Sequence, residues 1–300
     1  MINRRGFMKL VGGGFTSFAT LGGYALAVEP LGRLSIARYQ MTPPGWTPGL
    51  KLRLVALADL HACEPWMSAE RIVSICKRAN SLRGDVTLLL GDYASGMNFV
   101  TRRVPASEWS TALSTLKAPL GVHAVMGNHD WWEDRTAQKN GGGDTFAHRA
   151  LTRVGIEVHS NRAIRLEKDG FSFWLAGLED QLALRPGKIW KRRRMIGLDD
   201  LGGTLAQVTD KAPVILLAHE PDIFPDVPSR VSLTLSGHTH GGQVRLAGYS
   251  PVVPSRFGDR YAYGHIVEHD RNLIVSGGLG CSIAPIRFGV PPEIVVVDLG

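Results

Sequence analysis

Five short polar motifs in this chain each follow directly on a run of β-branched and aliphatic residues. The runs are 52–58, 86–90, 122–126, 214–218 and 231–236, and the motifs that follow them are Asp59-Leu60-His61, Gly91-Asp92, Gly127-Asn128-His129-Asp130, His219 and Gly237-His238-Thr239-His240. Runs of this length and composition predict buried strands. Because sites in α/β folds are built where strands end, the chain must adopt a fold that gathers five strand ends.

The order of the remaining elements indicates the fold class. Helices are predicted at 68–84, with Ser68 as the cap, and at 107–117, 145–153 and 201–210, and further strands at 171–177, 243–246, 273–276 and 294–297. Helices alternate with strands early in the chain, and strands cluster late. This pattern favours two packed sheets flanked by helices in one α/β domain spanning 50–300, preceded by a Pro-rich leader at 28–49.

The first 27 residues are expected to be a targeting segment. Arg4, Arg5 and Lys9 precede a Gly-rich apolar stretch from Leu10 to Leu26. This arrangement resembles a bacterial twin-arginine signal, which predicts export of the folded protein by the twin-arginine translocation machinery to the periplasm or cell envelope. Cleavage after Ala27 and retention as a membrane anchor both remain open.

Composition excludes several classes of protein. A chain of 300 residues with 44% hydrophobic residues can bury a sizeable core, which argues against disorder. The net charge of +7 favours anionic partners, but no nucleic-acid motif is present. Cys63, Cys76 and Cys281 are odd in number and irregularly spaced, which argues against a disulfide framework or zinc finger and leaves one disulfide open.

The polar motifs contain the residue types of a two-metal site. Asp59 and His61 alternate at one strand end, so both side chains are expected on the same side, where they can chelate one ion. The two oxygens of Asp92 can bridge two ions. The other candidate ligands are Asn128, His219, His238 and His240. Mixed nitrogen and oxygen ligands suit Mn, Fe, Zn or Co better than Ca or Mg.

Two such ions, roughly 3.5–4 Å apart, would turn a bridging water into a hydroxide and neutralise charge on a phosphoryl group. The ligand set therefore predicts hydrolysis of a phosphoester. With five motifs in this order, residues 50–299 resemble the calcineurin-like metallophosphoesterases, and with the N-terminal segment they resemble the exported twin-arginine branch. The resemblance implies a four-layer sandwich of two mixed β-sheets flanked by helices.

The resemblance also implies roles for individual residues. One metal would be held by Asp59, His61, Asp92 and His240, and the other by Asp92, Asn128, His219 and His238. His129 would stabilise the transition state or protonate the leaving oxygen, and Asp130 would orient the His129 ring. The family commonly places a second acid after the bridging aspartate, whereas this chain reads Gly91-Asp92-Tyr93-Ala94-Ser95. Since that acid is commonly an outer-shell residue, we expect activity without it.

Substrate choice is expected to come from loops. Residues 131–135, hinged at 141–143, are either a lid or a surface loop. The basic run 188–194 either binds a phosphate-rich substrate or an anionic membrane surface, or is a solvated face. His123, His148, His159, His265 and His269 lack a metal-site context and are expected to be structural or surface residues.

These observations predict an exported binuclear-metal phosphoesterase that hydrolyses a phosphodiester or diphosphate, with a phospholipid or nucleotide as the substrate class. One alternative is a lipid-linked nucleotide-sugar pyrophosphatase. Another is a non-catalytic metal-binding scaffold, which the full ligand set and His129 disfavour.

Overall fold

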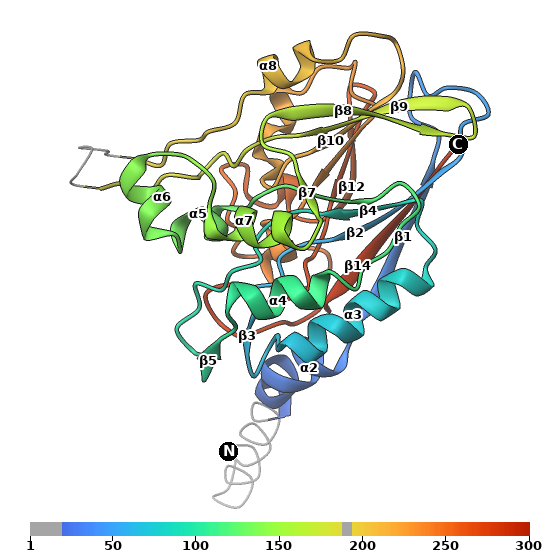
Figure 1. Cartoon of the computed structure of the whole chain (residues 1–300). Helices are drawn as coiled ribbons and strands as arrows, with labels where there is room; N and C mark the ends of the chain where they lie inside the picture. Colours follow the sequence, from blue (N-terminus) through green and yellow to red (C-terminus); the bar gives the residue numbers. More distant parts are fainter. Residues whose placement is uncertain (1–19, 188–193) are drawn as a thin grey trace, which may run out of the picture.

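The computed structural model describes residues 20–187 and 194–300, and its main feature is a pair of six-stranded β-sheets packed face to face (Figure 1). The first sheet has the order β1 (Ser35–Met41), β14 (Glu293–Leu299), β2 (Leu52–Leu57), β4 (Val86–Leu89), β6 (Val122–Ala124) and β7 (Glu157–Val158). β14 and β2 are antiparallel and all other neighbours are parallel. The carboxyl ends of β2, β4 and β6 therefore share one edge.

The second sheet is also mixed. Its order is β12 (Gly264–Glu268), β13 (Arg271–Val275), β11 (Leu233–Ser236), β10 (Val214–Leu217), β9 (Phe171–Gly177) and β8 (Arg162–Lys168). The four central strands are parallel, and the two edge strands are antiparallel to their neighbours. A separate small ribbon pairs β3 (Cys63–Glu64) with β5 (Arg102–Arg103).

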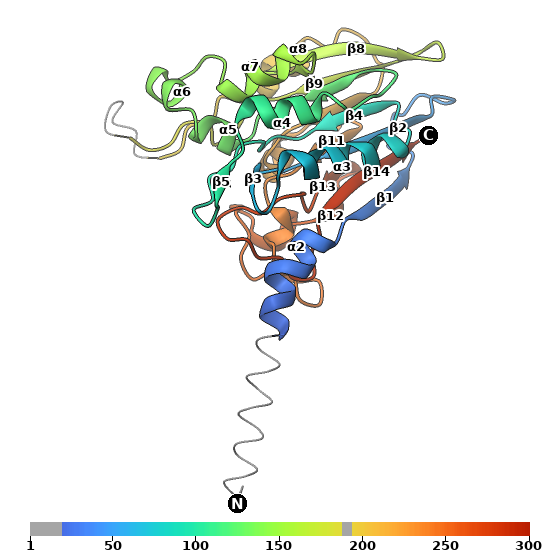
Figure 2. The same ribbon diagram turned by 60° about the horizontal axis from the view of Figure 1, so that its bottom comes forward.

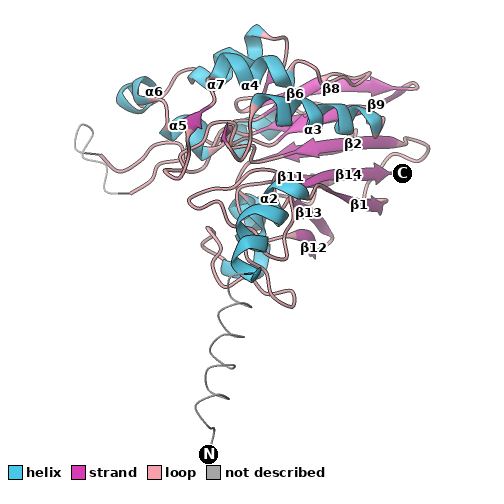
Figure 3. Ribbon diagram, turned by 90° about the horizontal axis from the view of Figure 1, so that it is seen from below, coloured by secondary structure: helices cyan, strands magenta, loops and turns pink. Residues whose placement is uncertain are grey.

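Helices cover the outer face of each sheet, and Figure 3 shows those that cover the first sheet. The first sheet is covered by α3 (Ala69–Ser81), α4 (Ala106–Leu113) and α7 (Phe146–Arg153), and the second by α8 (Leu201–Ala206) and the 3-10 helix η2 (Pro221–Asp226). The remaining helical segments are η1 (Tyr24–Val28), α2 (Glu29–Gly32), α5 (Asn128–Trp132), α6 (Arg135–Asn140), η3 (His240–Gly242) and η4 (Gly258–Tyr261). This arrangement of layers confirms the predicted fold class.

The aliphatic runs are continuous because the central strands are buried on both faces. Successive residues of a strand point to opposite faces. In β2, Leu54 belongs to the apolar cluster between the sheets, together with Ile215 and Leu233, whereas Val55 belongs to the cluster under the helices, together with Ile75 and Leu113. A strand in this position has no polar face, so the alternating pattern of a half-exposed strand is missing.

Several local expectations are corrected. The segment 28–49 is more than a leader, because residues 35–41 form edge strand β1, which pairs in parallel with β14. Residues 243–246 do not form a strand: left-handed backbone at Gly241, Gly242 and Gln243 turns the chain, which makes only isolated bridges. Edge strands β8 and β12 were not predicted: the exposed face of β8 carries charged residues, and β12 is a short, half-exposed strand of five residues.

Two further findings concern the cysteines and the membrane. Cys63, Cys76 and Cys281 are all free and buried, so the disulfide left open by the sequence is absent. Within 20–187 and 194–300, no helix has both the length and the apolar character needed to cross a bilayer. Arg4, Arg5 and Lys9 lie outside the described residues.

Candidate metal centre

The five polar motifs meet at one end of the two sheets. The loops after β2 and β4 are joined by hydrogen bonds from Asp59 N to Gly91 O (3.0 Å) and from His61 N to Asp92 O (2.9 Å). The loops after β10 and β11 are joined by a bond from Gly237 N to His219 O (3.0 Å). The backbone therefore holds the ligand-bearing loops in place.

Most of the candidate ligands have left-handed backbone. The φ angles are 56° at Asp59, 47° at His61, 59° at Asp92, 68° at His238 and 51° at His240. For residues other than glycine this conformation is unfavourable, and it is found mainly where a site requires it. Asp59 and His61 thus do converge, but through a turn after β2 ends at Leu57 and not by the strand alternation expected from the sequence.

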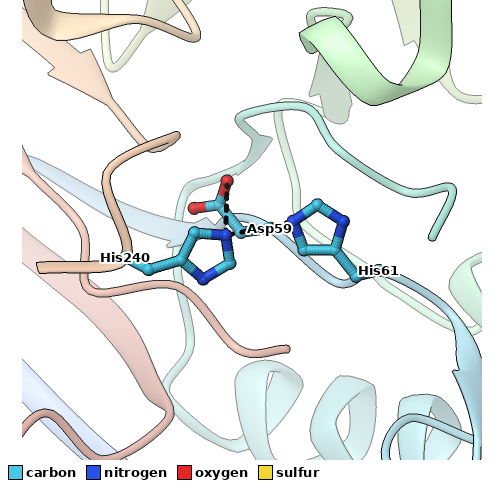
Figure 4. Close-up of side chains that lie close together, drawn as sticks. All are labelled: Asp59, His61 and His240. Atoms are coloured by element: carbon cyan, nitrogen blue, oxygen red, sulfur yellow. Dashed lines mark hydrogen bonds and ion pairs between the residues drawn. The ribbon is translucent and has the colours of Figure 1, made fainter. Parts of the chain in front are cut away.

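One half of the centre contains Asp59, His61 and His240 (Figure 4). His240 Nε2 lies 3.8 Å from Asp59 Oδ1 and 3.0 Å from His61 Nε2. Figure 4 shows Asp59 and His61 on the loop after β2 and His240 approaching them from another loop. All three are buried, so their nitrogen and oxygen atoms face a space shielded from bulk water.

The other half contains Asn128, His219 and His238, and Asp92 lies between the halves. Asp92 Oδ2 is 3.4 Å from His61 Nε2 and 3.3 Å from His219 Nε2. His238 Nδ1 is 2.9 Å from Asn128 Oδ1. The structure thus brings together all seven predicted ligands, with Asp92 positioned to serve both halves.

Contacts on the far side of three histidine rings determine which nitrogen faces the centre. With Nδ1–H donating to a carbonyl oxygen, His61 (to Ala94, 3.1 Å) and His219 (to Leu90, 2.6 Å) present an unprotonated Nε2. With Nε2–H donating to Pro254 O (2.9 Å), His238 presents Nδ1. This nitrogen faces the Asn128 amide oxygen, so two lone pairs meet at 2.9 Å. A cation between them would relieve that repulsion.

The electrostatics of the side chains also fit bound cations. Burial raises the pKa of Asp59 to about 7, and the neighbouring Asp92 charge acts in the same direction. Asp59 Oδ2 and His219 Nε2 are buried without a hydrogen-bond partner. Polar atoms that are buried and unpaired are costly, and divalent cations would satisfy them. The residues present therefore fit two metal ions.

His129 lies beside the centre. Its ring is 4.9 Å from that of His61 and 5.2 Å from that of Trp132, and Ser282 Oγ lies 3.4 Å from its Nε2. Burial lowers the pKa of His129 to about 3. The Nδ1 atom is buried without a hydrogen bond, and the nearest carboxylate oxygen is Glu133 Oε1 at 3.9 Å.

Asp130 does not have the position expected of it. Its Oδ2 accepts hydrogen bonds from the N–H groups of Asp92 (2.9 Å) and Gly127 (3.0 Å), and its Oδ1 accepts from Tyr93 (2.9 Å) and Ala94 (3.0 Å). With both oxygens bound to backbone donors, the carboxylate fixes the loop that carries Asp92. The predicted contact with the His129 ring is therefore wrong.

Arg287 supports the centre and was missed by sequence reasoning. The side chain is fully buried, and its guanidinium donates to the carbonyl oxygens of Gly277 (2.8 Å), Gly280 (2.9 Å) and Val290 (2.9 Å). Nη2 also lies 3.2 Å from His240 Nδ1. Burial lowers the pKa of His240 well below its usual value, and the neighbouring guanidinium adds to the effect, which keeps the imidazole neutral. No local pattern marks a loop arginine as buried.

Two more buried groups, Asp180 and Glu220, lie beside His219. Gln181 N donates to Glu220 Oε2 at 3.1 Å. Sequence reasoning missed both, although Glu220 directly follows a predicted ligand.

Of the two loops expected to select the substrate, the structure describes the segment 131–135 fully and only part of the basic run 188–194. Trp131 is buried in the core, Trp132 Nε1 donates to Leu182 O (2.8 Å), and Arg185 lies 4.4 Å from the Trp132 ring centre. The segment after Asp130 is therefore anchored through helices α5 and α6. Of the basic run, residues 188–193 lie outside the described part of the chain.

Comparison with known proteins identifies the family. A family model for calcineurin-like phosphoesterases matches residues 52–242, which carry all seven candidate ligands. The chain belongs to the calcineurin-like phosphoesterase family. This assignment confirms the predicted class of phosphoric ester hydrolase and the predicted requirement for two metal ions.

Relatives extend the match beyond the family model. The calcineurin-like chain is 30% identical to the uncharacterized metallophosphoesterase YkuE of Bacillus subtilis, over 99% of this chain and 98% of the relative. It is 26% identical to an uncharacterized metallophosphoesterase of Aquifex aeolicus, over 89% and 92%. It is also 32% identical to a transmembrane protein with a metallophosphoesterase domain of Danio rerio, over 83% of this chain and 53% of that protein.

Proposed function

We propose that this protein is an exported two-metal phosphoesterase that hydrolyses a phosphodiester or diphosphate. The observation that carries the proposal is the position of Asp92 Oδ2, within 3.4 Å of a histidine from each half of the centre. One carboxylate can thus hold two cations together. Two bound ions would supply an acidified water and neutralise charge on the phosphoryl group.

The chain's own residues have separate tasks in this reaction. Asp59, His61 and His240 bind on one side, and Asn128, His219 and His238 on the other, with ring orientations fixed by the contacts behind them. Burial of all these side chains excludes bulk water, which strengthens each electrostatic interaction with the phosphoryl oxygens. Asp130 keeps Asp92 in its strained conformation through four backbone donors.

His129 is the proposed proton donor to the leaving oxygen. It is the histidine at the centre whose ring borders both the ligand His61 and the side chains of Trp132 and Ser282. An alkoxide leaving group needs a proton, and an imidazolium next to the phosphoryl group would provide it. The anionic substrate would favour the protonated ring as it binds.

Export by the twin-arginine route, with action at the cell envelope, forms part of the proposal. It is supported by Arg4-Arg5 and the apolar stretch that follows. The Danio rerio relative is named as a transmembrane protein, which also favours a location at a membrane. Phospholipids and nucleotide-linked lipids are the anionic diesters and diphosphates of that environment.

The test is hydrolysis of a chromogenic phosphodiester, its monoester and a nucleotide-sugar diphosphate by the full chain with Mn, Fe, Co or Zn. We expect metal-dependent turnover of the diester or the diphosphate, but not in Asp92→Asn. His129→Ala should keep two ions per chain and lose turnover. Loss of metal in His129→Ala would identify His129 as a ligand. Two bound ions without turnover of any substrate would favour the alternative of a non-catalytic metal-binding scaffold.

A further inference from the structure

Exposed apolar side chains lie in the segments 246–252 and 282–284, which are joined through Gln243 and Phe288. We define the apolar rim as Leu246, Tyr249, Val252 and Ile283, whose exposed fractions are 54%, 61%, 75% and 80%. Large apolar side chains in such a cluster are unusual on a protein surface without a partner. Ile283 also has a φ of 53°, which is a genuine outlier for a β-branched residue. The fold thus accepts strain while this side chain remains in solvent.

The rim is connected to the residues of the centre by short contacts. Ser282, next to Ile283, places its Oγ 3.4 Å from His129 Nε2, and its N–H donates to Gln243 Oε1 at 2.6 Å. On the other side, Pro254 O accepts the hydrogen bond from His238 Nε2. Whatever covers the rim will therefore lie close to residues that contact His129 and His238.

The helical segments η1 and α2 lie beside the loop that follows Ile283 (Figure 2). Arg287 N donates to Ala25 O (2.9 Å), Val290 N donates to Glu29 Oε1 (2.8 Å), and the rings of Tyr24 and Phe288 are in contact, 5.9 Å apart. Phe288 in turn bonds to the segment that leads to Leu246, through Arg245 N to Phe288 O (2.8 Å). In the N-terminal segment itself, Leu21, Leu26 and Val28 are exposed.

We propose that the apolar rim and the exposed face of residues 20–34 form a docking surface that lies on a lipid bilayer. The occupant is indicated by the chain that leads to this surface: residues 10–26 are a charge-free stretch of apolar residues and glycine, and Ala25 near its end accepts a hydrogen bond from Arg287 N. Burial of such side chains at a bilayer interface removes apolar surface from water, and binding strengthens with the apolar area buried. The inference goes beyond hydrolysis, because it specifies which face of the molecule meets the membrane.

The test measures the position of Ile283 and is independent of turnover. The full chain carrying Ile283→Cys is labelled with an environment-sensitive fluorophore and mixed with vesicles of phosphatidylethanolamine and phosphatidylglycerol. The three native cysteines are buried, which favours labelling at the new position. The control is Ala206→Cys on α8, which lies at the opposite end of the molecule from helix α2 (Figures 1 and 2).

We expect a blue shift of the probe at 283, severalfold higher emission, and quenching by nitroxide-labelled lipids, with no change at 206. Adding Val252→Asp to the labelled Ile283→Cys chain should reduce the shift. A probe at 283 that stays in water while the protein sediments with the vesicles would overturn the proposal and favour a protein partner. Failure of the full chain to bind the vesicles would also overturn it.

Discussion

At the scale of single residues, the centre depends on burying charges that are stable only together. Asp92 is within hydrogen-bonding or ion-pair distance of groups from three loops: the His129 N–H, the His61 ring and the His219 ring. Neighbouring imidazoles hold its pKa well below the usual value even though burial acts in the opposite direction. Removal of this charge therefore affects both halves of the centre.

We expect Asp92→Asn to bind fewer than two ions per chain and to lose at least about 100-fold in turnover, since changing a residue that only hydrogen-bonds to a metal ligand already costs about 10–100-fold. The readouts are elemental analysis of the dialysed protein and the initial rate. Asp144→Asn, which removes an exposed acid, is the matched control. An Asp92→Asn protein with normal metal content would contradict the bridging assignment.

Glu179 gives a pH dependence of stability. Burial raises its pKa to about 8 from 4.5, although Ser160 donates to it at 3.2 Å. Between these pH values the folded state holds a proton that the unfolded chain releases, so the free energy of unfolding falls as pH rises from about 4.5 to about 8. Above about pH 8 the buried Glu179 is charged in the folded state, and the resulting loss in free energy of unfolding has an upper bound of roughly 5 kcal/mol.

Glu179→Gln should therefore raise the unfolding free energy at pH 8.5 by up to a few kcal/mol and change it little at pH 4.5, measured by urea denaturation. The exposed Glu167→Gln is the control. Equal effects of Glu179→Gln at both pH values would show that the gain is not due to the carboxylate charge.

At the scale of elements, the loops at the strand ends pack so closely that glycine is required. Gly127, the N-cap of α5, has extended backbone that any residue adopts, but a Cβ there would overlap the Asp92 carboxylate and lie 2.7 Å from His219 Cε1. Close approach of two loops, and not backbone conformation, therefore excludes a side chain.

We expect Gly127→Ala to displace Asp92 and reduce metal content and turnover by about 10-fold or more. Gly202→Ala on α8, where an added Cβ meets its nearest atom at 3.8 Å, should leave both unchanged. Calorimetric titration with Mn after chelation measures the affinity. Wild-type affinity in Gly127→Ala would show that the loops can separate without cost.

The loop that carries Arg287 is held to its neighbours by hydrogen bonds from this side chain. Arg287→Met leaves three buried carbonyl oxygens without their hydrogen-bond donor. Each unpaired carbonyl destabilises the folded state by about 1–3 kcal/mol. We expect a clear loss of thermal stability and weaker metal binding near His240. Arg287→Lys should restore only part of both, because an ammonium cannot reproduce the guanidinium geometry. Full rescue by lysine would show that charge alone is required.

At the scale of the whole molecule, the centre connects the two sheets. Asp59, Asp92 and Asn128 follow strands of the first sheet, whereas His219, His238 and His240 follow strands of the second. Ions bound between them link the layers at this end, in addition to the apolar cluster that fills the space between the sheets.

Chelation should therefore lower the melting temperature of the wild-type protein. Metal at 1,000 times its Kd contributes about 4 kcal/mol by linkage, which corresponds to roughly 8–16 °C for a domain of this size class. Differential scanning calorimetry with and without chelator measures the shift. Asp92→Asn should show a much smaller one, and an equal shift in both proteins would place the stabilising metal elsewhere.

The fold class and the seven candidate ligands could be predicted from the sequence, because both leave local signals. A strand buried on both faces needs an uninterrupted aliphatic run such as 214–217, and a ligand needs a particular side chain directly after it. Edge strand β1 lacked such a run, since only one face of it is covered.

The partners of buried charges were decided by the tertiary structure alone. Asp130 was expected to orient His129, yet it accepts hydrogen bonds from backbone N–H groups up to 38 residues away. Arg287 is stabilised in the interior by hydrogen bonds to carbonyl oxygens that no local sequence pattern reveals. Residue type and periodicity indicate which side chains will be buried or will bind metal. The energy of a buried charge depends on atoms distant in sequence, which only the folded chain brings within reach.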